Sequence, residues 1–197
     1  MRVVAGRLGG RSFNSPPGHR SHPMSEKMRG ALFNMLGDIT GLSVLDAFAG
    51  SGALGIEALS RGAAQVVAVE RDKLAYRTTA ENFDRLGLRA QARAIRAAAA
   101  AWSDNNPEAR FDLVLLDPPY RHLQLNLIQK LVRHAKAEGI IALSLPGDQQ
   151  APDLKGGRLL QSRGYGDAQL VLYRRNQLTL SGRVASGGDG QKRPRQI

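Results

Sequence analysis

The chain has 197 residues, no cysteine and a formal net charge of +11. This length predicts one domain with a sizeable core, and the lack of cysteine excludes a disulfide framework, a thiolate metal site and a cysteine nucleophile. No apolar run approaches the roughly 20 residues that cross a bilayer, and no signal-peptide pattern opens the chain, so we expect a cytoplasmic protein with no membrane partner.

The positive charge is concentrated at both ends of the chain, and arginine carries most of it. A high isoelectric point can reflect composition alone, but clustering at the two ends favours a polyanionic partner such as nucleic acid. The four histidines are not spaced as metal ligands, and we predict no metal site.

The N-terminal segment predicts a basic hairpin followed by a helix. Short strands at 2–5 and 11–14 flank a glycine turn, and Ser25 caps a helix over residues 26–36. Arg29 lies off the apolar stripe of this helix, where it either contacts nucleic acid or forms part of a solvated face. We interpret the arginines of the segment as candidate phosphate contacts: Arg2, Arg7, Arg11, Arg20 and Arg29.

Strand and helix patterns alternate over residues 41–145, which indicates an α/β domain. Such alternation predicts right-handed crossovers and a mostly parallel sheet with helices on both faces. Two last strands, joined by a glycine turn, predict an antiparallel pair at one edge. The expected strands are 42–46, 65–69, 91–95, 111–116, 139–145, 158–163 and 168–174, and the expected helices are 52–60, 73–86, 97–103 and 121–137.

We divide the chain into three regions. The hairpin and first helix form an N-terminal unit at 1–38, and the α/β domain covers 39–175. The remaining residues, 176–197, form a basic tail whose glycines and cations leave too little apolar content to fold alone.

The segment DAFAGSGALG at 46–55 ends one apolar strand and begins a helix. Its glycines satisfy G-x-G-x-x-G, and Glu70 ends the next strand, which together form the dinucleotide fingerprint. Asp46 precedes the first glycine, where a carboxylate suits the positively charged methionine moiety of S-adenosylmethionine better than a diphosphate. The candidate cofactor contacts are Asp46, Phe48, Ala49, Gly50, Ser51, Gly52, Glu70 and Arg71.

The segment DPPY at 117–120 follows another apolar strand. Ligands of open α/β sheets bind beyond the carboxyl ends of the strands, so this segment should lie beside the cofactor pocket. It is similar to the amino-methyltransferase motif (D/N)-P-P-(Y/F), and we assign catalysis to Asp117, Pro118, Pro119 and Tyr120. The carboxylate and the Pro118 carbonyl can accept the two hydrogens of an amine, and the tyrosine ring offers a face to a base.

Four stretches together resemble the bacterial 16S rRNA (guanine-N2)-methyltransferases of the RsmD type, over about residues 1–175. They are RVVAG at 2–6, HPMSEKMRGALFN at 22–34, DAFAGSGALGIEALSRG at 46–62 and DPPY at 117–120. The resemblance implies the class I methyltransferase fold, a seven-stranded, mostly parallel doubly wound sheet with an antiparallel edge hairpin. It also implies S-adenosyl-L-methionine as cofactor and, as substrate, a guanine N2 amine in 16S rRNA or a small-subunit assembly particle.

The chain departs from the family pattern at a few positions. His22, Met24 and Gly30 replace other residues of the second stretch, and alanines follow the third strand where an Asp or Asn usually holds the adenine. Backbone groups near Ala98 are therefore expected to hold the adenine. We expect the protein to be a monomer.

Several alternatives remain open. A DNA adenine-N6 or protein-glutamine methyltransferase would share the four-residue motif. The basic N-terminal hairpin argues against the glutamine enzyme, and the lack of a separate base-recognition domain argues against the DNA enzyme. The glycine fingerprint alone also fits an NAD-dependent oxidoreductase. An RNA-binding assembly factor without activity is the remaining alternative, against which the intact Asp117 and Pro118 argue.

Overall fold

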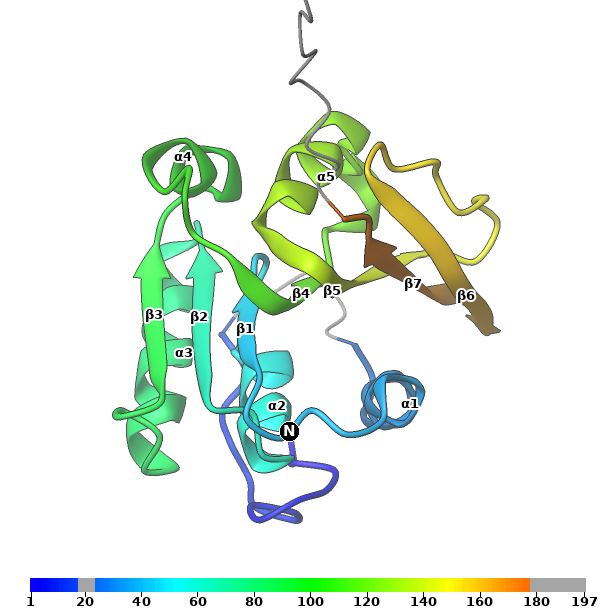
Figure 1. The fold of residues 1–197 in the computed structure, drawn as a ribbon. Helices are drawn as coiled ribbons and strands as arrows, with labels where there is room; N and C mark the ends of the chain where they lie inside the picture. The colour runs from blue at the N-terminus through cyan, green and yellow to red at the C-terminus, as the bar shows by residue number, and fades with distance from the viewer. Residues whose placement is uncertain (18–23, 178–197) are drawn as a thin grey trace, which may run out of the picture.

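Seven strands form one sheet in the order β3-β2-β1-β4-β5-β7-β6 (Figure 1). The computed structural model describes residues 1–17 and 24–177. The strands are β1 (Ser43–Asp46), β2 (Gln65–Glu70), β3 (Ala92–Arg96), β4 (Phe111–Leu116), β5 (Ala135–Pro146), β6 (Gly157–Tyr165) and β7 (Ala168–Arg175). The helices are α1 (Glu26–Leu36), α2 (Ala53–Ser60), α3 (Lys73–Arg85), α4 (Ala99–Asn105) and α5 (Leu125–Leu131), with short 3-10 helices at Tyr120–His122 and Val132–His134.

The strand directions confirm the predicted fold class. β1 lies between β2 and β4 and is parallel to both, and β3 and β5 extend the parallel sheet on either side. β7 is antiparallel to β5 and to β6, which forms the predicted edge pair. The carboxyl ends of β1, β2 and β4 therefore meet at one edge of the sheet.

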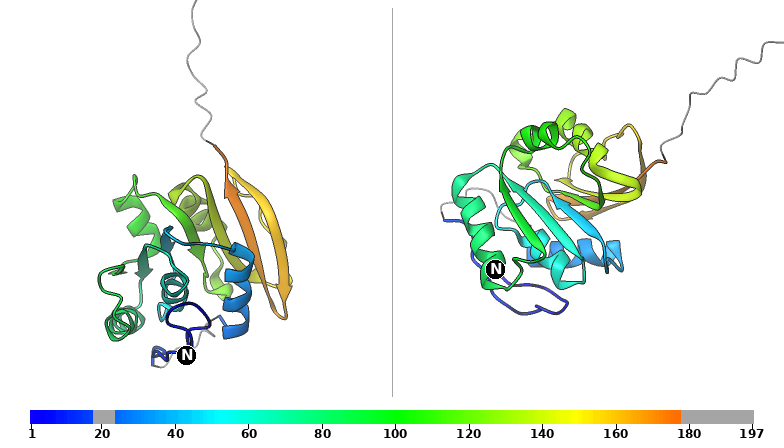
Figure 2. Two further views of the ribbon diagram at one scale, coloured as in Figure 1. Left: turned by 60° about the horizontal axis from the view of Figure 1, so that its bottom comes forward. Right: turned by 60° about the vertical axis from the view of Figure 1, so that its left-hand side comes forward.

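Helices cover both faces of this sheet (Figures 1 and 2). Residues of α1, α2 and α3 pack with Val44 and Leu113 in one apolar cluster, and residues of α4 and α5 pack with Leu45 and Val114 in the other. Consecutive strand residues point to opposite faces, so a strand covered on both faces is apolar at every position. This explains why Val44 and Leu45 of β1 and residues 113–116 of β4 are apolar in succession.

Most elements end within two residues of their predicted bounds, but the helix predicted at 121–137 is wrong. The structure has only the short α5 between two 3-10 helices, and β5 begins already at Ala135. Ala135 pairs with Phe111, after which the register shifts and Glu138 adopts a φ of 61°. Pairing with the first residue of β4 thus overrides the helical pattern of the sequence in this region.

The predicted N-terminal hairpin is also shorter than expected. In the N-terminal arm (residues 1–14), the bridge between Arg2 and Ser12 replaces the two strands expected at 2–5 and 11–14. The Val3 N–H donates to the Arg11 carbonyl at 2.9 Å, but residues 4–8 leave this ladder. Their backbone groups bind to α2 instead, as described below.

Two predicted features lie outside the described residues. One is Arg20, and the other is the basic tail from residue 178 onward. Within the described ranges, no helix has the length and apolar character needed to cross a membrane.

Candidate active site

The glycine loop between β1 and α2 lies at the carboxyl edge of the sheet. Gly50 and Gly52 have φ values of 58° and 81°, which glycine adopts without steric cost. The hydroxyl of Thr79 donates to the Gly50 carbonyl, and the side-chain amide of Asn82 donates to the Ser51 carbonyl, both at 2.9 Å. The loop is therefore fixed from α3.

Asp46 ends β1 and is buried with one unsatisfied oxygen. Its Oδ2 accepts the Gly55 N–H at 3.2 Å, whereas Oδ1 has no hydrogen-bond partner among the described residues. The pKa of this carboxyl is raised to about 7, mainly by burial. The carboxylates of Asp117 and Glu70 also raise the pKa, whereas the backbone N–H groups of Gly55 and Phe48 lower it. A positively charged ligand group would satisfy the free oxygen and lower this pKa.

Glu70 ends β2, half-buried beside the loop. Its Oε2 accepts the Gly50 N–H at 2.8 Å and its Oε1 accepts the Asp72 N–H at 2.7 Å. The carboxylate thus fixes the loop backbone. Asp72 caps α3, because its side chain accepts the N–H groups of Leu74 and Ala75 at the start of this helix.

The other predicted cofactor residues differ in exposure. Phe48 is partly buried and packs against the apolar cluster that contains α4 and α5, and Ala49 is buried. Arg71 is exposed. Ala98 is the exposed N-cap of α4, just beyond the carboxyl end of β3. Ser51 is buried within the glycine loop.

Asp117 follows β4 directly and is half-buried. In the sheet, Asp46 pairs with Leu115, so Asp117 lies two positions beyond Asp46 on the neighbouring strand. Burial raises the pKa of Asp117 to about 6, and a hydrogen bond from Ser144 opposes this rise. A group with this pKa is largely ionised at neutral pH and can accept hydrogen bonds.

The rest of the DPPY segment surrounds this carboxyl. Pro118 is buried, Pro119 is exposed and Tyr120 is partly buried. The Tyr120 hydroxyl and the Ser144 hydroxyl are 2.5 Å apart, so β5 fixes the orientation of the tyrosine ring. We missed Ser144 in the sequence, although a lone hydroxyl in the apolar run of β5 was an available signal.

The candidate nucleic-acid residues fall into two groups. Arg2, Arg7 and Arg11 are exposed on the N-terminal arm. Arg29 was expected either to contact nucleic acid or to lie on a solvated helix face, and both expectations are wrong. Its side chain is fully buried, and its Nε lies 3.5 Å from Glu57 Oε2. Its placement off the apolar stripe directs it toward this internal carboxylate and not toward solvent, so it cannot reach RNA.

Titratable side chains do not form a metal site in the part of the chain that the structure describes. The site instead joins a glycine loop, a buried carboxylate without a counter-ion and a proline-flanked aspartate at adjacent strand ends. On a seven-stranded sheet with an antiparallel last pair, this combination defines a methyltransferase of class I.

The comparisons with known proteins give the family. The chain belongs to the family described as Conserved hypothetical protein 95, whose model matches residues 1–174. It is 32% identical over 182 residues to "Putative rRNA methyltransferase YlbH" of Bacillus subtilis, covering 89% of this chain and 99% of that protein. It is 31% identical over 143 residues to "Ribosomal RNA small subunit methyltransferase D" of Escherichia coli, covering 72% and 70%.

A solved structure agrees with these relatives. The structure titled "Putative methyltransferase yhhF from Escherichia coli" superposes with a TM-score of 0.79 at 29% sequence identity, covering 89% of this chain and 98% of that chain. These matches confirm the resemblance to the RsmD type, and they identify the enzyme class as a methyltransferase.

Proposed function

We propose that this protein transfers a methyl group from S-adenosylmethionine to the exocyclic N2 amine of a guanine in 16S rRNA or a small-subunit assembly particle, as a monomer in the cytoplasm. The observation that carries the proposal is the position of Asp117. Asp46 pairs with Leu115 on the adjacent strand, and Asp117 lies two residues beyond Leu115. An amine acceptor at this position would lie beside the loop that we assign to the cofactor. The names of the relatives support rRNA over DNA, protein glutamine or NAD chemistry.

The residues at the glycine loop fit S-adenosylmethionine. The unsatisfied Oδ1 of Asp46 would accept a hydrogen bond from the charged methionine moiety, and Glu70 would face the ribose hydroxyls. A Cβ on Gly50 would meet no atom within 4 Å, so the space beside this residue is open. When bound, the cofactor supplies an electrophilic methyl group on a sulfonium.

The remaining predicted contacts complete this pocket. We assign Phe48, Ala49, Ser51 and Gly52 to the loop that encloses the cofactor, and Arg71 to its exposed rim. Ala98 would offer backbone groups to the adenine, because it ends the loop after β3 at the same edge of the sheet.

The chemistry requires activation of a weak nucleophile, because the lone pair of a guanine amine is delocalised into the ring. Asp117 would accept one amine hydrogen, and the Pro118 carbonyl, which precedes Pro119, would accept the other. Two acceptors draw the nitrogen toward tetrahedral geometry and aim its lone pair at the methyl carbon. Correct orientation of two reactants contributes about 7–11 kcal/mol to lowering a barrier. As the nitrogen–carbon bond forms, Asp117 can hold the proton that the amine releases.

Tyr120 would hold the target base against the site. Its ring is oriented by the hydrogen bond to Ser144, and base–aromatic stacking contributes roughly 1–3 kcal/mol. A guanine within a helix would have to leave the stack to reach this position. The exposed arginines Arg2, Arg7 and Arg11 would contact phosphates near the entry, and we assign the same role to Arg20.

The experiment is to incubate the purified protein with labelled S-adenosylmethionine and rRNA from a strain that lacks it, and then map the modified nucleotide by mass spectrometry. We expect one N2-methylguanine in the small-subunit rRNA. Calorimetric titration should show binding of S-adenosylhomocysteine and none of NADH. A product in DNA or protein, or none with either free rRNA or assembly particles, would refute the proposal.

A further inference from the structure

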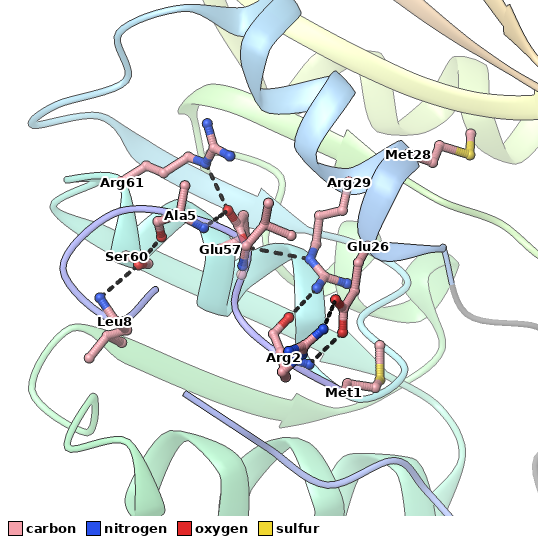
Figure 3. Close-up of polar contacts among 12 residues, drawn as sticks. Met1, Arg2, Ala5, Leu8, Glu26, Met28, Arg29, Glu57, Ser60 and Arg61 are labelled. Atoms are coloured by element: carbon pink, nitrogen blue, oxygen red, sulfur yellow. Dashed lines mark hydrogen bonds and ion pairs between the residues drawn. The ribbon is translucent and has the colours of Figure 1, made fainter. Parts of the chain in front are cut away.

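The N-terminal arm is attached to α2 through a buried carboxylate, Glu57 (Figure 3). The Glu57 oxygens accept the backbone N–H groups of Val4 at 2.8 Å and Ala5 at 3.1 Å. Arg61 Nε donates to the same carboxylate at 2.8 Å, and Arg29 approaches from α1. A carboxylate without exposure needs such partners, because burying an unpaired charge is unfavourable. The arm is therefore part of what keeps Glu57 satisfied.

One turn further along α2, Ser60 forms a second attachment. The Leu8 N–H donates to the Ser60 hydroxyl at 3.0 Å, which itself lies 2.5 Å from the Ala5 carbonyl. The Arg7 N–H donates to the Ser60 carbonyl at 2.8 Å. Gly6 has a φ of +80°, and a Cβ there would lie 2.0 Å from the Ser60 carbonyl oxygen. The arm can lie this close to α2 only because residue 6 is glycine.

Arg29 attaches the two ends of the arm from α1. It donates through Nη2 to the Arg2 carbonyl, and its guanidinium lies 5.9 Å from the ring centroid of Phe13. The side chain of Arg2 itself is 68% exposed. The arm backbone is thus held from inside the protein, while its arginine side chains lie at the surface. Arg2 forms an exposed ion pair with Glu26 at 3.5 Å, and Arg7 Nη2 donates to Gln91 Oε1 at 2.7 Å. Phosphate groups would have to replace these two surface partners.

We propose that Glu57, Ser60 and Arg29 are positioning residues for the RNA substrate. They fix the arm backbone, so that Arg2, Arg7 and Arg11 meet the RNA as a preformed set of cations. A fixed set loses less conformational entropy on binding than cations on a flexible chain. Because α2 also begins at the glycine loop, one helix relates the RNA-binding arm to the cofactor site. This inference rests on the proposed function, since it requires an RNA substrate.

The test compares two glycine substitutions in the arm. Gly6→Ala and Gly10→Ala carry the same backbone strain, since the φ values are +80° and +81°, but a Cβ at Gly10 meets no atom within 4 Å. We expect Gly6→Ala to raise the KM for rRNA about tenfold. The slope of log affinity against log salt concentration should also become shallower by about 2, because each of the three arginine–phosphate contacts contributes about 0.7 to the slope. Gly10→Ala should stay within about twofold of wild type, and both variants should bind S-adenosylhomocysteine as wild type does.

A second background separates positioning from a general loss of structure. In a variant with Arg2, Arg7 and Arg11 all changed to Gln, the cations are already gone. Gly6→Ala should then add less than about twofold to the KM, because coupled changes are not additive. Ser60→Ala, which adds no atom, should raise the rRNA KM in the same direction by a smaller factor and should also lose its effect in the triple-Gln background.

The outcomes distinguish this inference from the proposed function. If the wild-type protein modifies no rRNA, the proposed function fails and the inference fails with it. If the wild type is active but Gly6→Ala and Gly10→Ala have equal KM values, only the positioning inference is refuted. An equal effect of Gly6→Ala with and without the three arginines would refute it as well.

Discussion

Asp46 and Glu57 are buried carboxylates of the same sequence segment, and their surroundings are opposite. Glu57 accepts two backbone N–H groups and lies beside Arg29 and Arg61, so the protein itself satisfies its charge. Among the described residues, Asp46 has no ion-pair partner and keeps one oxygen without a hydrogen bond, and its pKa is raised to about 7, mainly by burial.

The comparison separates a group that stabilises the fold from one that is prepared for a ligand. Desolvating a charge is costly unless partners compensate for it within the protein. At Glu57 the compensation is internal, and the result is a fixed attachment of the N-terminal arm. At Asp46 the described residues supply little compensation, and we propose that a bound cation supplies the rest.

Of the substitutions considered, Glu57→Ala should have the largest effect, and this effect should be on the stability of the fold. The variant leaves Arg29 buried without its counter-ion, which should lower the free energy of unfolding by about 3–5 kcal/mol. Urea denaturation measures it, with Glu81→Ala on the exposed side of α3 as a control that should change stability by less than about 0.5 kcal/mol. Equal midpoints for the two variants would contradict the assigned role of Glu57.

Asp117→Ala should act mainly on activity. Loss of the amine acceptor should reduce kcat by about 100- to 1000-fold, as for other groups that act on the transition state. The affinity for S-adenosylhomocysteine should change only a few-fold, because in the proposed mechanism Asp117 contacts the target amine and not the cofactor. Asp117→Asn keeps an acceptor oxygen and should fall between wild type and alanine. Methylation by Asp117→Ala at a near wild-type rate would refute the mechanism.

Glu70→Ala should weaken cofactor binding by about 1.5–3 kcal/mol, the range for a hydrogen bond to a charged group. The effect should lie mainly in the KM for the cofactor, since this contact persists through the reaction. Asp72→Ala is the matched control, because Asp72 caps α3 and should change stability alone. If calorimetry gave both variants the same cofactor affinity, Glu70 would have no place in the site.

The raised pKa of Asp46 predicts a pH dependence of stability. An unfolded Asp titrates near pH 4, whereas the folded one titrates near pH 7, so between these values the folded state binds more protons. The free energy of unfolding should therefore fall as pH rises through this window, by at most about 1.4 kcal/mol per pH unit from this group.

Asp46→Asn should reduce that slope without removing it, because the pKa of Asp117, raised to about 6, contributes with the same sign. Thermal denaturation at several pH values between 4 and 8 measures the difference. If stability depended on pH in the same way in the variant and the wild type, Asp46 would not have the raised pKa that distinguishes it from Glu57.

The sequence alone determined the fold class and the two motifs of the site. The alternation of apolar strands with helices indicated the sheet, since strands covered on both faces must be apolar throughout. Gly50 and Gly52 could be predicted as turn residues because a left-handed backbone favours glycine. Asp117 could be predicted as a site residue because it follows an apolar run and precedes two prolines. These are local properties, which depend on neighbouring residues in the chain.

The tertiary structure decided which charged groups face inward. Arg29 reads as a surface residue in a helical pattern, but it lies opposite Glu57, a residue far along the chain on α2. The pairing of Ala135 with Phe111 ended a predicted helix, and the bonds from residues 4–8 to α2 shortened a predicted hairpin. In each case the deciding partner is distant in sequence. Pairing a buried charge or an unbonded backbone group gains more free energy than the local preference for a helix or a hairpin.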